Sequence, residues 1–314
     1  MIRLAIIIIN YKTPTLVQDC IQSLSGQIQD GLDQVVVVDN NSGDGSVEQL
    51  EKFIIENGWT DWIKVIPSLV NGGFSAGNNI GIRAVKAEYY MLLNSDTIVR
   101  PGAVDKLLSV ALMQSDVGIV GPRMEWPDGT PQGSCFRTRS PAYEFFAAAQ
   151  TGILEKMFGY KPRTISPDKH MIEPEWISFA CVLINSKVFE QVGLLDEGYF
   201  MYYEDIDFSR RTLQFGYKIV YSPSAIVVHL QEQSSVLVEK RNKRRRLPNY
   251  MYQSRAYYYR KFYRRIGLIL ANTLWMLGFM VSLLRKVLHR RELPVPEYAW
   301  KDIWMETFSS MKVP

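Results

Sequence analysis

The sequence predicts an α/β protein built on a mostly parallel central sheet with helices on both faces, and three observations indicate it. Runs of Ile, Val and Leu alternate along the first half of the chain with segments of helical periodicity. These runs are apolar at consecutive positions, which is typical of strands buried on both faces. Asn, Asp or Ser stands at the end of four of the runs, and in such sheets ligands gather at the carboxyl ends of the strands.

The composition allows one large α/β domain or two smaller ones. The chain has 314 residues, of which 47% are hydrophobic, and this is enough to bury a substantial core. The three cysteines lie far apart, and none belongs to a C-x-x-C pair, so neither a disulfide framework nor a cysteine metal site is expected. The first apolar run is too short for a secretory signal, and we interpret it as the first strand.

Each element of the first half follows from its pattern. The sequence predicts strands at 4–10, 34–42, 62–68, 89–96 and 117–122, and helices at 13–27, 46–58, 74–87 and 102–115. Residues 124–174 are rich in turn formers, so loops and short helices are expected there. The pattern returns with a strand and a helix within 176–193, a helix that begins near Glu204, and a strand pair over 218–230 ending in His229.

The C-terminal part has a different character. Basic residues concentrate between Lys240 and Arg265, and an uncharged apolar run of bilayer-spanning length follows at 266–284. A buried core helix is one interpretation of this run. Contact with an anionic membrane surface is the other and is favoured, because basic residues flank the run at both ends, as in a helix lying in the interface. We therefore expect a domain at 1–235 and a helical, membrane-associated region at 236–314.

Polar residues at the strand ends form the candidate site. For any one of them an ordinary turn or helix cap is the alternative, but four polar strand ends in register favour a single site. Following the order of the strands, the candidates are Asn10, Tyr11, Asp39, Asn71, Gly73, Asn78, Ser95 and Asp96.

Two common chemistries of such sheets are improbable here. A nicotinamide site needs a glycine-rich turn after the first strand, and the sequence there is NYKTP. A P-loop needs Gly-Lys-Ser or Gly-Lys-Thr, which is absent. The remaining candidate is a sugar-nucleotide site.

In a sugar-nucleotide site, Asp39 accepts a hydrogen bond from the imide N–H of a uracil or thymine ring, although capping toward Ser46 is the alternative. Asp96 binds a divalent cation, Mn²⁺ or Mg²⁺, that bridges two donor phosphate oxygens. His229 is a candidate second ligand, while a structural role is the alternative for a lone histidine at a strand end.

The segment YYEDIDFSRR offers a general base. Glu204, Asp205 and Asp207 place three carboxylates within four positions, and like charges this close raise the pKa of at least one of them. A raised pKa suits the deprotonation of an acceptor hydroxyl. An acidic first helical turn paired with Arg210 and Arg211 is the structural alternative.

Five segments together resemble a known family. IIIINYKTPTLVQDCIQSL, VVVVDNNSGDGS, NGGFSAGNNIGI, YYMLLNSDTIV and the segment at 193–229 occur in the order and spacing of family 2 glycosyltransferases with the GT-A fold. Over roughly residues 1–235 the chain is most similar to bacterial rhamnosyltransferases of surface polysaccharide synthesis. The D-x-D-like motif has one carboxylate here, Asn94-Ser95-Asp96.

The resemblance implies roles for several residues. Asp39 would contact the nucleobase, Asp96 and His229 would bind the metal, and Asp205, beside Glu204, would be the catalytic base of an inverting transfer. The donor would be a dTDP- or UDP-sugar, with rhamnose as one candidate sugar, and the acceptor a glycan or a polyprenyl-linked glycan. Arg241 and Arg255 are candidate contacts to the donor diphosphate.

The resemblance also implies a location at the cytoplasmic face of the membrane, peripheral or monotopic. Nucleic-acid binding is a weaker interpretation of the basic C-terminal segment, and the oligomeric state is open. Two alternative functions stay open, a sugar nucleotidyltransferase and a catalytically silent GT-A-like scaffold in a polysaccharide assembly complex. The first usually carries a glycine-rich basic loop after its first strand, which NYKTPT lacks.

Overall fold

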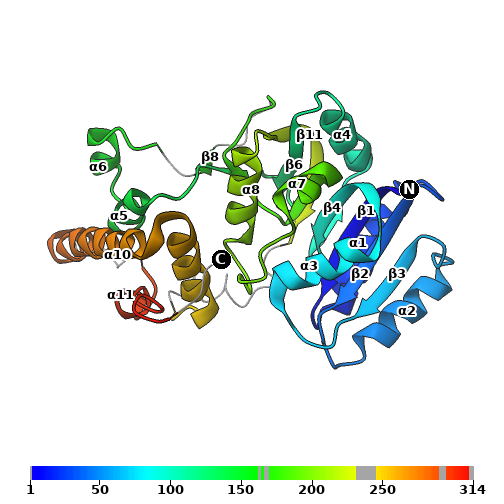
Figure 1. Ribbon diagram of the computed structural model, residues 1–314, viewed down its shortest axis with the longest axis horizontal. Helices are drawn as coiled ribbons and strands as arrows, with labels where there is room; N and C mark the ends of the chain where they lie inside the picture. The colour runs from blue at the N-terminus through cyan, green and yellow to red at the C-terminus, as the bar shows by residue number, and fades with distance from the viewer. Residues whose placement is uncertain (1, 162–163, 166–169, 231–244, 290–294, 311–314) are drawn as a thin grey trace. The chain divides into compact units, whose positions relative to one another are not determined.

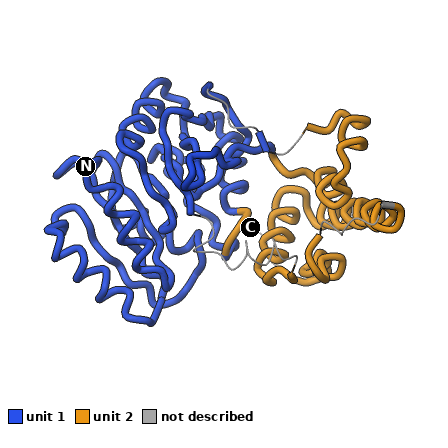
Figure 2. The backbone as a smooth tube through the Cα atoms, turned by 180° about the vertical axis from the view of Figure 1, so that it is seen from behind, with its two compact units in different colours: residues 1–137, 164–200, 204–234 blue, residues 138–163, 201–203, 235–314 orange. Residues whose placement is uncertain are grey.

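The computed structural model describes residues 2–161, 164–165, 170–230, 245–289 and 295–310. The chain forms two compact units, shown in different colours in Figure 2. Unit 1 comprises residues 1–137, 164–200 and 204–234, and unit 2 comprises residues 138–163, 201–203 and 235–314. Residues 138–163 and the short segment 201–203 thus belong to unit 2, although both precede the boundary expected at residue 235.

Unit 1 is built on one large sheet (Figure 1). Its strand order is β3-β2-β1-β4-β10-β6-β11-β5. The bounds are β1 Ile2–Asn10, β2 Asp33–Asp39, β3 Ile63–Pro67, β4 Ala87–Asn94, β5 Thr97–Val99, β6 Val117–Glu125, β10 Cys181–Asn185 and β11 Lys218–His229. A small second sheet has the order β8-β7-β9, from Thr164–Ile165, Cys135–Phe136 and Trp176–Ile177.

The mostly parallel sheet predicted from the sequence is confirmed. Strands β1, β2, β3 and β4 pair in parallel, and so do β6 and β11. Strand β10 is antiparallel to both of its neighbours, and β5 is antiparallel to β11. The expectation of two strands over 218–230 was wrong, because this segment is one strand whose register shifts between Ser222 and Ile226. Pro223 lies in the shift and has no N–H to donate to a regular ladder.

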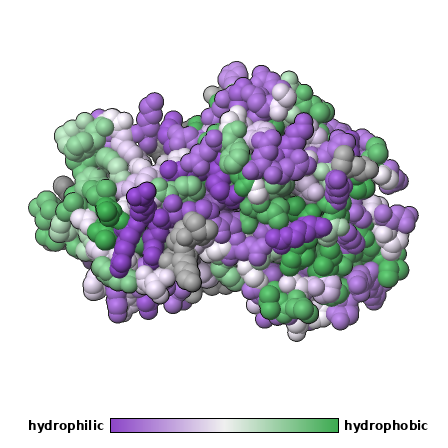
Figure 3. All heavy atoms as spheres, in the orientation of Figure 1, coloured by the Kyte–Doolittle hydropathy of each residue, from purple (hydrophilic) through white to green (hydrophobic). Residues whose placement is uncertain are grey.

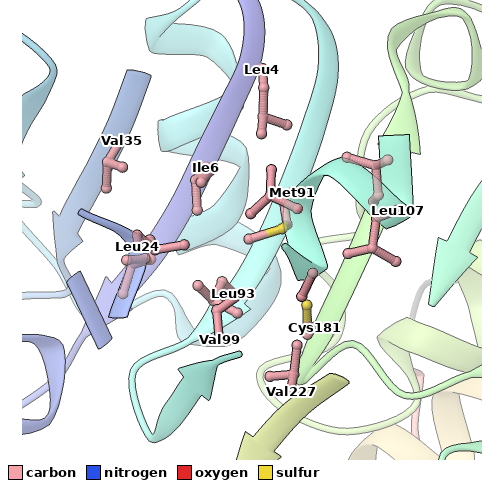
Figure 4. Close-up of a cluster of buried hydrophobic side chains, with 14 of the residues drawn as sticks. Leu4, Ile6, Leu24, Val35, Met91, Leu93, Val99, Leu107, Cys181 and Val227 are labelled. Atoms are coloured by element: carbon pink, nitrogen blue, oxygen red, sulfur yellow. The ribbon is translucent and has the colours of Figure 1, made fainter. Parts of the chain in front are cut away.

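Helices cover both faces of the sheet. Alternate residues of β1 enter opposite cores, Leu4 and Ile6 on one face and Ala5 and Ile7 on the other, which explains why the strand is apolar at successive positions. Figure 4 shows the first core, to which α1 contributes Leu24. The first face is covered by α1 Pro14–Leu24, α2 Ser46–Glu56 and α4 Ala103–Ala111, and the second by α3 Gly73–Ala84, α7 Ser186–Val192 and α8 Glu204–Gln214.

The cysteines belong to these buried regions. Cys20, Cys135 and Cys181 are free and buried, in agreement with the expectation that no disulfide framework is present. Burial raises the pKa of the Cys20 thiol to about 12. The thiols therefore fill space in the core as small apolar groups.

Unit 2 is helical over its described residues, except for the connecting segments. It contains α5 Pro141–Ala149, α6 Gly152–Met157, α10 Asn249–His289 and α11 Ala299–Asp302. Arg264 has φ 58° and ψ −178°, so α10 consists of two helical parts that meet at this residue. The second part packs closely on α5 at Gly278, where an added Cβ would lie 2.2 Å from the carbonyl oxygen of Phe145.

The second part of α10 has two different faces. One face is buried and includes Leu268, Asn272 and Trp275. The other face is exposed and apolar, with Ile266, Leu270, Leu277, Met280, Leu284, Val287 and Leu288. By length and composition alone, Asn249–Leu288 qualifies as a membrane-crossing helix, as core helices of soluble proteins also do. Figure 3 shows hydrophobic residues gathered over α6 and α10.

Candidate active site

The carboxyl ends of β1 and β2 lie side by side. The parallel register pairs Asn10 with Asp39, and the Asn10 amide donates hydrogen bonds to Asp39 Oδ1 at 2.7 Å and to Ser42 Oγ at 3.2 Å. Asp39 is 3% exposed and also accepts from the backbone N–H of Ser42 at 3.0 Å and from its hydroxyl at 2.6 Å. A carboxylate has about four acceptor positions, so these three bonds leave room for a ligand donor.

The N-cap residue of α2 is Gly45, which has no side chain to cap the helix. The backbone N–H of Ser46 donates to Asp44 Oδ1 at 3.1 Å, and the expected alternative of capping by Asp39 toward Ser46 was wrong. Asp44 lies in the glycine-containing turn, closer in the chain to the helix start than Asp39. The turn after β2 therefore holds the Asp39 carboxylate at the strand end, where it forms a polar cluster with Asn10 and Ser42.

Asn40, next to Asp39, connects the end of β2 to the residues at the start of α3. Its amide donates to Asn71 Oδ1 at 2.9 Å and to the carbonyl oxygen of Gly73 at 3.1 Å, and it accepts from the N–H of Gly72 at 3.3 Å. Asn40 directly follows Asp39, so its place among the polar strand ends follows from the sequence, but it was not among the residues chosen as candidates for the site.

Gly73 has a geometric reason to be glycine. Its φ is +81°, and an added Cβ would lie 1.9 Å from the carbonyl oxygen of Phe200. The N–H of Phe74 donates to this same carbonyl at 2.8 Å. The start of α3 thus holds the segment that leads toward α8.

Two other candidates behave differently. Asn78 is 1% exposed, and its amide bonds within α3 to the carbonyl oxygen of Phe74 at 3.0 Å. Tyr11 is 46% exposed, and the Lys12 ammonium lies 5.5 Å from its ring centroid. These contacts do not involve Asp39, and Tyr11 is accessible for a stacking contact.

Asp96 and His229 come together although they are far apart in the sequence. Strand β5 follows Asp96 directly, and its antiparallel pairing with β11 places Thr97 opposite His229. Asp96 Oδ1 lies 3.4 Å from His229 Nε2, with Asp96 1% exposed. The hydroxyl of Ser95, next to Asp96, lies 3.4 Å from that of Thr13 before α1, and the N–H of Thr13 donates to Asn10 Oδ1 at the end of β1 at 3.2 Å.

This pair fits a divalent cation. Two ligand atoms that each lie about 2.1 Å from one metal are themselves about 3 Å apart. The separation of Asp96 Oδ1 and His229 Nε2 is close to that value. The described residues contain no cluster of three or more His, Cys, Asp or Glu side chains arranged for a metal.

The three carboxylates at the start of α8 lie in three environments. Asp207 is fully buried and accepts from the Tyr199 hydroxyl at 3.0 Å and from Arg211 Nε at 2.6 Å, so its role is structural. Asp205 is partly exposed, and its Oδ1 accepts from the N–H of Ile206 at 2.8 Å. Of the three, Asp205 is the carboxylate most accessible to an acceptor.

Glu204 is the buried member of the group. It is 7% exposed, and its Oε2 has no hydrogen-bond partner among the described residues. Burial first, and then the charges of Asp205 and Asp207, raise the pKa of this carboxyl well above its usual value. This agrees with the sequence-based expectation that at least one pKa in the group is raised. The residue whose pKa is raised is Glu204.

Of the two arginines expected at the donor diphosphate, the structure describes only Arg255. Arg241 lies outside the described residues. Arg255 is 6% exposed in unit 2, where it donates to Asn272 Oδ1 at 2.7 Å and pairs with Glu144 Oε2 at 3.2 Å. Breaking a buried pair of this kind costs about 3–5 kcal/mol, so Arg255 has a structural role within unit 2 and is not included in the site proposed below.

Comparison with known proteins agrees with this fold. The chain matches the family Glycosyl transferase family 2 over residues 5–162, about half of its 314 residues. The protein belongs to this family.

Two relatives illustrate the similarity. The low-salt glycan biosynthesis hexosyltransferase Agl10 of Haloferax volcanii is 32% identical over 212 residues, which cover 66% of this chain and 61% of the relative. The N-acetylglucosaminyl-diphospho-decaprenol L-rhamnosyltransferase of Mycobacterium tuberculosis is 28% identical over 217 residues, which cover 64% of this chain and 67% of the relative. The chain thus matches about three fifths to two thirds of the length of these relatives.

Solved structures share the GT-A fold. The mannosyltransferase PcManGT from Pyrobaculum calidifontis, in complex with GDP-Man and Mn²⁺, matches with a TM-score of 0.59 at 13% identity over 93% of this chain and 76% of that chain. GalNAc-T7 with UDP, GalNAc and Mn²⁺ matches with a TM-score of 0.58 at 16% identity over 73% of this chain and 44% of that chain. At these identities the similarity concerns the fold.

Proposed function

We propose that this protein is an inverting glycosyltransferase that transfers a sugar from a nucleotide-diphosphate donor to a hydroxyl group of a glycan acceptor. The observation that carries the proposal is the pairing of Asp96 and His229 at 3.4 Å, joined through Ser95 and Thr13 to the polar strand ends around Asp39. Family membership supports this reaction class.

The nucleotide half of the donor would bind at the ends of β1 and β2. Asp39 keeps one acceptor position beyond its bonds to Asn10 and Ser42, and it would receive the imide N–H of uracil or thymine there. Tyr11, 46% exposed beside this end of β1, would stack on the base. Such a donor is a UDP- or dTDP-sugar.

Asp96 and His229 would hold a divalent cation, Mn²⁺ or Mg²⁺, together with the diphosphate. When bound, the cation supplies positive charge that stabilises the departing diphosphate. Two structural neighbours were solved with Mn²⁺, which supports the choice of ion. Ser95 Oγ, next to Asp96 in the chain, would donate a hydrogen bond to a phosphate oxygen.

Asp205 would act as the general base. It would take the proton from the acceptor hydroxyl while the acceptor oxygen bonds to the anomeric carbon and the bond from that carbon to the diphosphate oxygen breaks. Burial and the nearby charges of Asp205 and Asp207 raise the pKa of Glu204, so this carboxyl holds its proton more tightly than an ordinary glutamate does.

The acceptor and the location are further parts of the proposal. The M. tuberculosis relative is named for rhamnosyl transfer to a polyprenyl-linked sugar, which supports rhamnose as one candidate donor sugar and a lipid-linked glycan as the acceptor class. The exposed apolar face of α10, which includes Ile266 and Leu284, would lie in the interface of the cytoplasmic leaflet. Arg264, Arg265, Arg285 and Lys286 flank this run and would attract anionic lipids.

A donor screen tests the reaction. Purified protein would receive dTDP-rhamnose, UDP-glucose, UDP-galactose or GDP-mannose with Mn²⁺, and released nucleoside diphosphate would be measured for the wild type and for Asp205→Asn. We expect one dTDP- or UDP-sugar to turn over, with loss of activity in EDTA and at least a hundredfold lower kcat in the variant. Metal-independent turnover, or full activity of Asp205→Asn, would contradict the mechanism.

A further inference from the structure

Two consecutive aromatic residues directly before Glu204 adopt a backbone conformation that bulky side chains rarely take. Tyr202 has φ +67° and Tyr203 has φ +72°. A left-handed conformation at bulky residues persists only where the surroundings hold it, and such strain is concentrated near functional sites. The proposed base, Asp205, stands two residues after Tyr203.

Residues 201–203 belong to unit 2, and the contacts that hold them are made within this unit. Ser254, on the first part of α10, is 3% exposed and donates from Oγ to the carbonyl oxygen of Met201 at 2.9 Å. The ring of Tyr202 stacks on that of Tyr250, with centroids 6.3 Å apart and planes 16° apart. Helix α10 therefore contacts both the backbone and a side chain of the segment.

Tyr203 is held by an arginine. The Arg139 guanidinium donates through Nη1 to the Tyr203 hydroxyl and lies 4.5 Å from the centroid of its ring. Arg139 is itself fixed, because the hydroxyls of Tyr258 and Tyr263 donate to its carbonyl oxygen at 3.2 and 3.1 Å. Tyr203 is 4% exposed and packs on Tyr258, with ring centroids 5.5 Å apart.

On both sides of this segment the chain is held by unit 1. The carbonyl oxygen of Phe200 accepts from the N–H of Phe74, and Asp207 is bonded to Tyr199 and Arg211. The chain thus passes from unit 1 to unit 2 and back within residues 200–204. Residues 201–203, held by contacts within unit 2, are thus joined directly to the start of α8, which carries Asp205 in unit 1.

We propose that Arg139, Tyr203 and Ser254 are positioning residues for the base Asp205, through their hold on residues 201–203. This inference rests on the proposed function, because it assigns a role in the same transfer. A general base must lie within hydrogen-bond distance of the proton that it removes, and a displacement of about 1 Å can cost on the order of a hundredfold in rate. The residues assigned to nucleotide and metal binding lie in unit 1, so these three residues affect the chemical step and not donor affinity.

Matched pairs of variants test the inference in the full-length protein. Ser254→Ala and Tyr203→Phe each remove one hydroxyl that contacts or belongs to residues 201–203. Ser282→Ala and Tyr259→Phe are the controls, since these buried hydroxyls on α10 donate elsewhere than to residues 201–203. The Ser282 hydroxyl donates to Ala148 O at 2.6 Å, and that of Tyr259 to Glu144 Oε1 at 2.7 Å and Ser140 O at 3.2 Å. Both pairs remove the same atoms from unit 2.

We expect the Ser254→Ala/Tyr203→Phe double variant to lower kcat for sugar transfer at least tenfold, while donor KM and the Kd of UDP or dTDP stay within about twofold of the wild type. The control double variant should keep kcat within about threefold at a similar loss of melting temperature. A kcat that falls equally in both double variants, or that falls only with a loss of nucleotide affinity, would overturn the inference. If the wild type transfers no sugar, or Asp205→Asn remains active, the proposed function fails and the inference fails with it.

Discussion

The carboxylates at the start of α8 show how neighbouring residues of like charge take different roles. Asp207 is neutralised by Arg211, Asp205 reaches solvent, and Glu204 is buried with an oxygen that has no hydrogen-bond partner in the described part of the chain. The sequence predicted that the closeness of these charges raises the pKa of at least one carboxyl. It could not show which of the side chains is buried. The helical turn decides which side chain faces the core.

The raised pKa of Glu204 predicts a pH dependence of stability. An unfolded glutamate has a pKa of about 4.3, so the folded state binds this proton more tightly than the unfolded state. The stability from protonated Glu204 is fully present below that pH and is lost as pH rises through the folded pKa. Glu204→Gln keeps the side chain neutral, and its unfolding free energy relative to the wild type should rise between about pH 4 and pH 8 in urea titrations.

Glu56→Gln is the control for this experiment, because Glu56 is exposed and its pairing with Lys52 at 3.7 Å is a surface contact. Its unfolding free energy relative to the wild type should change little over the same pH range. A pH dependence of Glu204→Gln that does not differ from that of Glu56→Gln would contradict the buried, neutral carboxyl.

At the scale of elements, position 73 at the start of α3 requires glycine because of its backbone conformation and its close contact with Phe200. Gly73→Ala combines a left-handed φ with a Cβ placed 1.9 Å from the Phe200 carbonyl oxygen, and we expect it to lower the free energy of unfolding by more than about 3 kcal/mol. Gly45→Ala is the matched control, since Gly45 has φ +80° before α2 with no atom within 4 Å of an added Cβ. It should cost about 1 kcal/mol in the same urea titrations. Equal losses would contradict the close packing of α3 on Phe200.

Most elements of unit 1 were predictable because each strand and helix carries its own local pattern. β1 reads as a strand from its apolar run alone, and α8 begins at Glu204 as expected. The antiparallel insertion of β10 between β4 and β6 was not predictable, because strand direction depends on contacts distant in the sequence. The single strand β11 was missed for a related reason, since Pro223 interrupts the local pattern while the pairing with β6 resumes beyond it.

Some features of the candidate site were also predictable from the sequence, and others depend on the folded structure. The polar strand ends on β1 and β2 were predictable, because parallel strands bring their carboxyl ends to one edge of the sheet. The distance between Asp96 and His229 depends on the β5–β11 register, which only the folded chain displays. The basic segment of α10 suggested a ligand for Arg255, whereas the structure provides the buried partner Glu144 from α5.

At the scale of the whole molecule, α10 explains why the sequence supported two interpretations of one apolar run. Its buried face packs within unit 2, and its other face is apolar and exposed. Replacing Ile266 and Leu284, 80% and 63% exposed, with Ser should weaken sedimentation with vesicles that contain phosphatidylglycerol at least tenfold. Leu69→Ser, at a 93% exposed site in unit 1, is the control and should leave vesicle binding unchanged. Equal binding by all variants would exclude this face as the membrane contact.

Calorimetry of UDP and dTDP binding with Mn²⁺ tests the proposed donor and metal site, for the wild type, Asp96→Ala, His229→Ala and the loop control Asp44→Ala. We expect the wild type and Asp44→Ala to bind one of the nucleotides only when Mn²⁺ or Mg²⁺ is present. Loss of Asp96 or His229, the proposed metal ligands, should weaken binding at least tenfold. Binding that is unaffected by EDTA and by both substitutions would contradict the metal site, and no binding by the wild type would favour a catalytically silent scaffold.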